Sequence, residues 1–231
     1  MARGSRLLRL AELVPPDTLL ERLNTVKPLA EEMILPTNGE EAVTLQTIIR
    51  DVRDESTFIR GELVYERPVP LRQIDGSVKY GKDAQSVSFV FYADSPFLVI
   101  LANKEVSEKV AFKMNRMLFN GENMILKTYI SEEVIQEFLH QNPHLILRIH
   151  WSNLRIPGIN KAALAGSDVI RAPDPRRYDM HGERSYIVVR LLENGWAIGI
   201  SRGGSIVFFK NTITDDEIIE FVRRKIISLM E

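Results

Sequence analysis

The sequence predicts an α+β protein in which helices pack on one face of an antiparallel sheet. Three times, a strand-like segment leads into a segment with helical periodicity, starting at Phe97, Met124 and Ser205. Tight turns join several neighbouring strand-like segments, which is typical of antiparallel pairs. The hydrophobic fraction of 45% and the charged fraction of 26% are those of an ordinary folded protein.

Composition excludes several classes of protein. The 231 residues include 30 Lys and Arg, 31 Asp and Glu, and no Cys. A disulfide scaffold and any Cys-ligated zinc or iron–sulfur site are therefore excluded, and the balanced charge excludes a wholly basic nucleic-acid coat. No apolar run approaches the ~20 residues that span a bilayer. The first residues lack the apolar core of a signal peptide, so we expect a cytoplasmic protein with no membrane partner.

Residues 1–53 are expected to form a helical N-terminal segment. Its apolar residues recur with helical spacing in two stretches, at Leu7, Leu8, Leu10 and Leu13, and at Leu45, Ile48, Ile49 and Val52. Prolines at positions 15 and 16 separate the first stretch from a second helix over about 18–26. We interpret the segment as a helical cap on a sheet, with a winged helix-turn-helix as the alternative.

An α+β body is expected over 54–231, either as one domain or as two similar halves, 54–150 and 151–231. It begins with a strand-like stretch near 58–65, followed by a long polar hairpin loop over 71–85. The clearest strands are 86–93 and 97–102, which the short turn Asp94-Ser95-Pro96 joins into an antiparallel hairpin. Asn103 is the expected N-cap of a helix over 105–118.

The rest of the body alternates strands and helices around one long loop. We expect strands at 124–129 and 145–150 with a helix at 132–140 between them. Residues 154–184 lack periodicity and contain several prolines and glycines, so they are expected to form a loop with room for a short strand at Val169 and Ile170. Strands at 185–192, 196–200 and 205–210 and a helix at 215–229 complete the chain.

Two segments of the body resemble each other. Residues 126–141 read LKTYISEEVIQEFLHQ and residues 209–224 read FKNTITDDEIIEFVRR, with identical residues at five of 16 positions. Ser131 and Thr214 stand where each helix begins, where a hydroxyl accepts a hydrogen bond from a helix amide. The acids that follow face the positive end of the helix dipole. The likeness has two interpretations, an internal duplication or convergence of well-capped helices, and both stay open.

The long loop holds the best candidate for catalysis. Four carboxylates and a histidine fall within 16 positions, and such a group can bind a divalent metal for hydrolysis: Asp168, Asp174, Asp179, His181 and Glu183. Arginines are interleaved with these acids, however, and a salt-bridged, solvated loop is the simpler interpretation. The sequence has no helical histidine pair with metal spacing, no nucleophile elbow and no phosphate-binding glycine loop. We therefore expect no enzyme, no cofactor and no metal.

The arginines of the same loop are the candidate binding residues. Arg171, Arg176, Arg177 and Tyr178 combine charges for phosphates with a ring for stacking, and Lys79 and Lys82 lie on the other long loop. Each phosphate contact releases counterions, so clustered cations favour binding even where the net charge is near zero. We expect contacts to be mainly with phosphates, because nothing here resembles a base-reading helix.

The order of elements from Ser86 to His150 resembles a known family. A hairpin (SVSFVFYADSPFLVILA), a helix (EVSEKVAFKMNRML), a short strand (NMILKTY), a capped helix (SEEVIQEFL) and another strand follow one another as in the core of the recombination-associated RdgC proteins. The same order is similar to the sheet of centromere proteins N and L. The resemblance, over residues 86–150, is one of topology and hydrophobic pattern, and no functional residue carries over.

The resemblance implies a protein that binds DNA or a nucleoprotein assembly, since RdgC proteins encircle DNA as dimers. Our leading hypothesis is therefore non-enzymatic binding of nucleic acid or of a nucleoprotein assembly. The alternative is a protein-interaction subunit or homo-oligomer without direct nucleic-acid contact. A third hypothesis is a metal-dependent hydrolase that uses the acids of the 168–183 segment.

Overall fold

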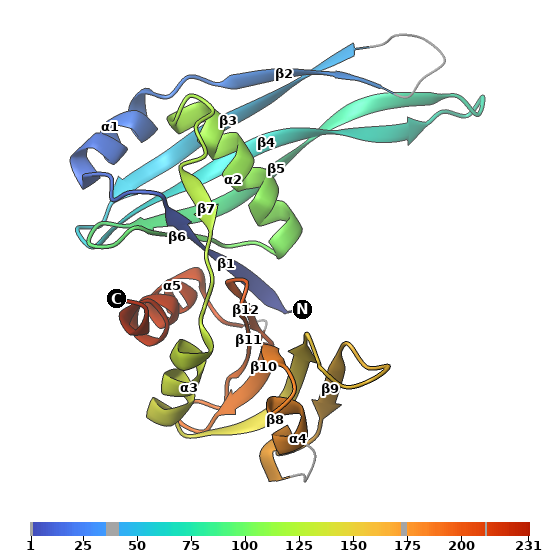
Figure 1. The fold of residues 1–231 in the computed structure, drawn as a ribbon. Helices are drawn as coiled ribbons and strands as arrows, with labels where there is room; N and C mark the ends of the chain where they lie inside the picture. Colours follow the sequence, from blue (N-terminus) through green and yellow to red (C-terminus); the bar gives the residue numbers. More distant parts are fainter. Residues whose placement is uncertain (1, 36–41, 172–174, 211) are drawn as a thin grey trace. The chain divides into compact units, whose positions relative to one another are not determined.

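The computed structural model describes residues 2–35, 42–171, 175–210 and 212–231, and the chain forms two compact units. Unit 1 contains Met1–Arg9, Leu101–Ser107 and Lys127–Glu231. Unit 2 contains Leu10–Ile100 and Glu108–Leu126. The chain therefore passes from one unit to the other several times, and residues 127–150 belong to the same unit as residues 151–231 (Figure 1).

Unit 2 is built on five antiparallel strands. Their order is β2-β3-β4-β5-β6, with bounds β2 (Leu29–Ile34), β3 (Ala42–Asp54), β4 (Phe58–Arg72), β5 (Val78–Tyr92) and β6 (Phe97–Ile100). β4 and β5 pair over 15 residues each, from Phe58 opposite Tyr92 to Arg72 opposite Val78. Only residues 73–77 turn the chain between them, so the far half of this hairpin forms a two-stranded arm (Figure 1).

The core of unit 2 lies between this sheet and its helices. Leu63 and Phe89 are fully buried on one sheet face, and the helix α2 (Lys104–Leu118) buries Met114 completely. Lys113 of α2 lies over the ring of Tyr65 on β4. Glu31 of β2 bonds both Lys113 and Arg116, which ties α2 to the edge of the sheet. The helix α1 (Pro16–Thr25) packs against β3 and buries Leu19 and Leu23.

Unit 1 is built on six antiparallel strands. Their order is β1-β12-β11-β10-β8-β9, with bounds β1 (Arg3–Leu10), β12 (Ser205–Phe208), β11 (Ala197–Ser201), β10 (Glu183–Leu191), β8 (His144–Ser152) and β9 (Ala162–Ala165). The ring of Phe221 in α5 (Asp215–Lys225) packs edge to face against the ring of Phe208 on β12, with 5.3 Å between the ring centroids. Phe138 of α3 (Glu132–Gln141) contacts Phe221 in turn. The two helices thus share one aromatic cluster with the sheet.

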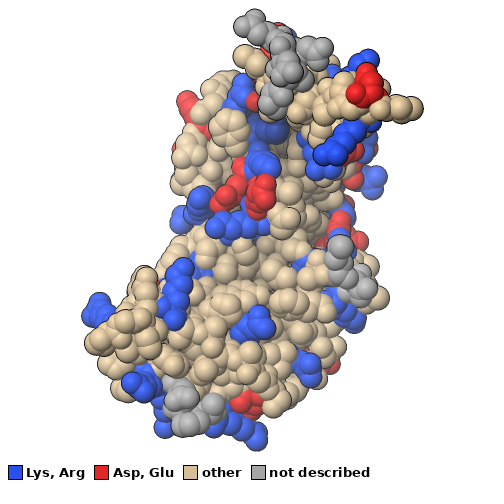
Figure 2. Space-filling view, turned by 90° about the vertical axis from the view of Figure 1, so that its right-hand side faces the viewer, with Lys and Arg blue, Asp and Glu red and all other residues tan. Residues whose placement is uncertain are grey.

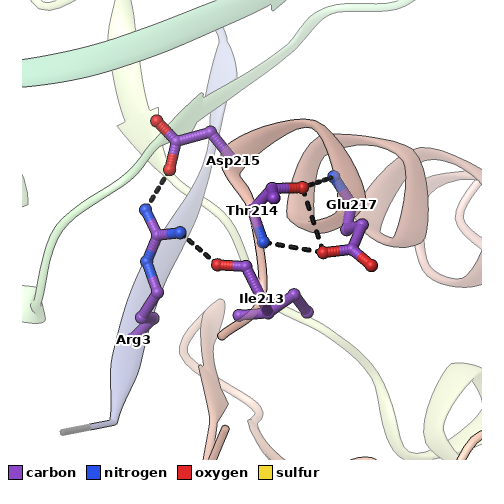
Figure 3. A network of polar contacts seen from close by, with 5 residues as sticks. All are labelled: Arg3, Ile213, Thr214, Asp215 and Glu217. Carbon is purple, nitrogen blue, oxygen red and sulfur yellow. Dashed lines mark hydrogen bonds and ion pairs between the residues drawn. The ribbon is translucent and has the colours of Figure 1, made fainter. Parts of the chain in front are cut away.

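The start of α5 is fixed by a network of polar contacts (Figure 3). The Thr214 hydroxyl accepts a hydrogen bond from the amide of Glu217 at 3.2 Å, and the Glu217 carboxylate accepts one from the amide of Thr214 at 2.7 Å. This reciprocal pair is a capping box. Arg3 of β1 bonds the Asp215 carboxylate and the Ile213 carbonyl. The first strand of unit 1 therefore holds the beginning of its last helix.

Several predictions for the body are confirmed. The antiparallel hairpin of 86–93 and 97–102 is present as β5 and β6, and the expected helices at 105–118, 132–140 and 215–229 are α2, α3, and α5 followed by the short 3-10 helix η2 (Ile227–Leu229). Asn103 accepts a hydrogen bond from the Val106 amide at 3.0 Å, as an N-cap should. The chain is a mixed helix and strand protein with an antiparallel sheet. The packing of all helices on one face, and the internal duplication, stay predictions.

The helical N-terminal segment over 1–53 is wrong. Of its described residues only α1 is helical, and β1, β2 and β3 are strands, so the winged helix-turn-helix alternative is also wrong. Leu7 and Leu8 are both buried because β1 is covered on both faces, and a continuous apolar run does not distinguish a strand from a helix. In β3, the β-branched residues Thr47, Ile48 and Ile49 favour a strand over the helix that their spacing mimics.

The loop expected over 71–85 is wrong over most of its length, and the loop expected over 154–184 contains short regular elements. Residues 71–72 and 78–85 belong to β4 and β5, because polar side chains pair across the arm, such as Arg67 with Asp83 at 2.7 Å. The 154–184 segment contains β9, the 3-10 helix η1 (Val169–Arg171) and the helix α4 (Pro175–Asp179). The short strand at Val169 and Ile170 is therefore a 3-10 turn. Nowhere in the described residues is a helix both long and apolar enough to cross a bilayer.

Candidate nucleic-acid interface

Three of the predicted binding residues lie together on α4 in unit 1. Arg176 and Arg177 are exposed, whereas Tyr178 packs its ring against Trp151 of β8 with 5.2 Å between ring centroids. Asp179 ends the helix and accepts hydrogen bonds from the Trp151 indole at 2.8 Å and from Arg184 at 2.6 and 2.8 Å. The last two residues of α4 therefore anchor the helix, and the two arginines before them project from an ordered support.

The bond between Asp179 and Arg184 is partly buried, with side-chain exposures of 28% and 10%. Burial raises the pKa of the Asp179 carboxyl, but the hydrogen bonds from Arg184 and Trp151 outweigh burial and hold the pKa below its ordinary value. On the other side of the pair, the hydrogen bond to Asp179 raises the pKa of Arg184. Asp179 is therefore ionised at neutral pH. Its two oxygens accept the hydrogen bonds that hold the end of α4 in place.

The other acids of the proposed hydrolase site are also engaged. Asp168 binds Arg171 at 2.9 Å, and Glu183 binds Arg202 at 2.6 Å. Asp174 lies outside the described residues. Among the residues that the structure does describe, no three His, Asp or Glu side chains come together as a metal site would require. This arrangement favours the salt-bridged loop, which was the simpler interpretation of the sequence.

The structure places the remaining predicted binding residues in two different units. Arg171 ends η1 in unit 1 and is exposed, although it pairs with Asp168. Lys79 and Lys82 lie on β5 in the arm of unit 2, where Lys82 pairs with Glu66 at 3.3 Å and Lys79 is exposed. Arg171, Arg176, Arg177 and Tyr178 therefore belong to unit 1, and the two lysines belong to unit 2.

Sequence reasoning missed a second surface of unit 1, on one face of β8 and β10. Tyr186 of β10 stands directly opposite His150 of β8 in the strand register, and Val188 stands opposite Arg148. The Tyr186 and His150 rings meet edge to face at 5.3 Å. The signal for this face was present in the alternation Arg148-Ile149-His150-Trp151, in which the apolar residues are buried and their neighbours are at least partly exposed.

Both ring residues on this face are uncharged at neutral pH. Burial and the positive charge of Arg148 together lower the pKa of His150. Burial also raises the pKa of the Tyr186 hydroxyl, although Arg148 opposes it. Side chains of the neighbouring strands are small: Gly199 lies beneath Tyr186, and Ala163 and Ala165 of β9 are exposed. The lower part of Figure 2 shows Lys and Arg scattered singly over a mostly uncharged surface, with few acids.

Comparison with known proteins identifies no relative: no family model and no curated protein matches this chain. The resemblance of residues 86–150 to RdgC and to centromere proteins N and L stays a proposal. The function has to be argued from the surfaces of the two units.

Proposed function

We propose that this protein binds nucleic acid or a nucleoprotein assembly without catalysing a reaction, mainly through phosphate contacts. The observation that carries the proposal is the uneven pairing of charges around α4. Asp168, Asp179 and Glu183 each bind an arginine of the same unit. Arg176 and Arg177 are exposed and form no ion pair with any described carboxylate.

Unpaired arginines are well suited to phosphates. An arginine that already binds a carboxylate must give up that bond before it contacts a phosphate, whereas Arg176 and Arg177 have no such bond to a described residue. The guanidinium group donates two parallel hydrogen bonds to phosphate oxygens, which strengthens the contact beyond its charge. α4 is held in place by Tyr178 and Asp179, so less conformational entropy is lost on binding.

A salt titration tests the proposal. The wild-type protein and the double variant Arg176→Ala/Arg177→Ala are titrated with a labelled 20-base-pair DNA of random sequence over a range of salt concentrations. Loss of two phosphate contacts should lower affinity and reduce the slope of log affinity against log salt by about 1.8, at ~0.9 per contact. Binding should depend little on DNA sequence.

A matched control separates phosphate contacts from net charge. Arg50→Ala/Arg67→Ala removes the same charge from unit 2, at two half-exposed arginines that already bind Glu62 and Asp83. It should leave the slope nearly unchanged. Lys79→Ala/Lys82→Ala tests the second predicted contact separately. Equal effects of the α4 variant and its control, or no binding by the wild-type protein at low salt, would contradict the proposal.

One observation favours the alternative of a protein partner. Leu71, Ile74 and Val78 are exposed at the tip of the β4–β5 arm, and Ile74 is fully exposed. Apolar side chains at the end of a projecting hairpin are suited to insertion into a partner protein. If the wild-type protein binds no nucleic acid, this tip is the first place to search for a protein-interaction site.

A further inference from the structure

One face of the unit 1 sheet carries an aromatic platform. The phenol of Tyr186 lies directly over Gly199, where a Cβ atom would stand only 2.0 Å from the hydroxyl oxygen. Glycine at this position leaves room for the hydroxyl end of the ring, and Tyr186 remains partly exposed. His150 borders the ring on the next strand. Two adjacent, uncharged rings therefore stand on a rigid support of antiparallel strands.

A shallow groove of about 450 Å³ continues from the platform toward the edge strand β9. Its lining residues include Trp151 together with His150, Ser152, Lys161, Ala163 and Ser185. The small residues among them leave room for a flat ring between the larger ones. The hydroxyl of Ser152 and the Lys161 ammonium supply donors around it, whereas the Ser185 hydroxyl already donates to the His150 carbonyl at 3.3 Å.

The charges on this surface are positive and available. Arg148, Arg190 and Lys161 are exposed, and none of them forms an ion pair within the described part of the chain. Glu183 is the nearest acid on β10 in sequence to Tyr186, and it is already bound to Arg202. The surface therefore attracts anions beside two rings that stack on planar groups.

We infer that this face binds single-stranded nucleic acid, with bases stacked on Tyr186 and His150 and phosphates bound by Arg148 and Lys161. A single strand presents the faces of its bases, whereas a duplex buries them in its own stack. The inference rests on the proposed function for the class of ligand, but it assigns a different surface. Trp151 points toward α4, and its neighbours His150 and Ser152 point to the opposite face of β8.

The test uses the full chain and two fluorescein-labelled probes, a 12-residue oligothymidine and a 12-base-pair duplex. The wild-type protein should bind the single strand at least about 10-fold more tightly than the duplex. Tyr186→Leu keeps an apolar side chain over Gly199 but removes the ring, and should weaken single-strand binding about 10-fold, within the range for one stacked base. Tyr186→Phe keeps the ring and should bind like the wild type. Comparing the affinities for oligothymidine and for an oligouridine of equal length shows whether the face prefers DNA or RNA.

A second variant keeps the test decisive if Tyr186→Leu does not fold. Arg148 is exposed, and Arg148→Ala should fold normally, weaken single-strand binding and lower its salt slope by about 0.7. Equal binding of both probes, or equal binding by the Leu and Phe variants at position 186, overturns the inference while the proposed function stands. No binding of either probe by the wild-type protein overturns both.

Discussion

Phe138 of α3 and Phe221 of α5 meet edge to face, with 6.1 Å between their ring centroids and 74° between their planes. They occupy the same position in the two similar sequence segments, where each follows a glutamate. Both rings are buried, and Phe221 also contacts Phe208 and Trp196. The similar segments thus pack against each other through their equivalent residues, at the centre of the unit 1 core.

This ring contact should appear as a coupling energy. Phe138→Leu and Phe221→Leu each destabilise the protein, and the double variant should be less unstable than the sum of the two by about 1 kcal/mol. Urea unfolding of the four proteins measures the cycle. Phe89→Leu in unit 2 is the control partner for Phe221→Leu, because Phe89 pairs with Phe91 instead, and that cycle should be additive. Additivity in the first cycle would show that the rings only fill space.

The two helix caps differ in strength. Thr214→Ala removes a reciprocal capping box and should destabilise by about 1 kcal/mol. Ser131 accepts a single backbone hydrogen bond, at 3.3 Å from the Val134 amide, so Ser131→Ala should cost less, about 0.5 kcal/mol. Thr214→Ser keeps the hydroxyl and serves as the control. Denaturant melts measure all three, and a larger loss at Ser131 than at Thr214 would contradict the geometric ranking.

The carboxylate of Asp179 should make stability depend on pH. Its pKa in the folded protein lies below the ordinary value of 3.8, so it stabilises the fold above that value and the contribution is lost as the pH falls through the folded pKa. Asp179→Asn should therefore cost about 2 kcal/mol at pH 7, because it leaves Arg184 without its ionic partner. The difference between the two proteins should shrink below about pH 4.

An exposed pair provides the control for that measurement. The side chains of Arg224 and Glu220 in α5 are 75% and 46% exposed in their ion pair, and exposed pairs contribute little. Glu220→Gln should therefore change the free energy of unfolding by less than about 0.5 kcal/mol at either pH. A pH-independent loss at Asp179→Asn would mean that its hydrogen-bonding shape, rather than its charge, holds α4.

A side chain at Gly199 should displace the Tyr186 ring. A Cβ atom there would overlap the Tyr186 phenol, so Gly199→Ala should destabilise by about 1–3 kcal/mol. Adding Tyr186→Ala should recover part of that loss, because the obstacle is removed. Gly166→Ala is the control, since its nearest contact would be Val169 at an ordinary 3.8 Å. Thermal melts of the three variants and the wild type check the expectation, which fails if Gly199→Ala is as stable as the wild type.

Local rules predicted the parts of the fold that local chemistry determines. The hairpin before α2 and the caps at Asn103, Ser131 and Thr214 depend on residues a few positions apart. Whether the segments of β1 and β3 form strands or helices depends on long-range packing. The helical spacing of their apolar residues was therefore misleading. Likewise, the sequence predicted arginines around α4, but the bond from Trp151 to Asp179 joins residues 28 positions apart. The Tyr186 platform required the strand register, which the sequence pattern alone does not supply.

The pairing of β1 with β12 determines when unit 1 can be completed during synthesis. Ser5 lies opposite Ile206, 201 positions later in the chain. As the ribosome extends the polypeptide, β1 therefore emerges about 200 residues before the strand that pairs with it on that side. Its buried leucines lack that neighbour throughout the interval. We therefore expect the sheet of unit 1 to close only after β12 has been synthesised.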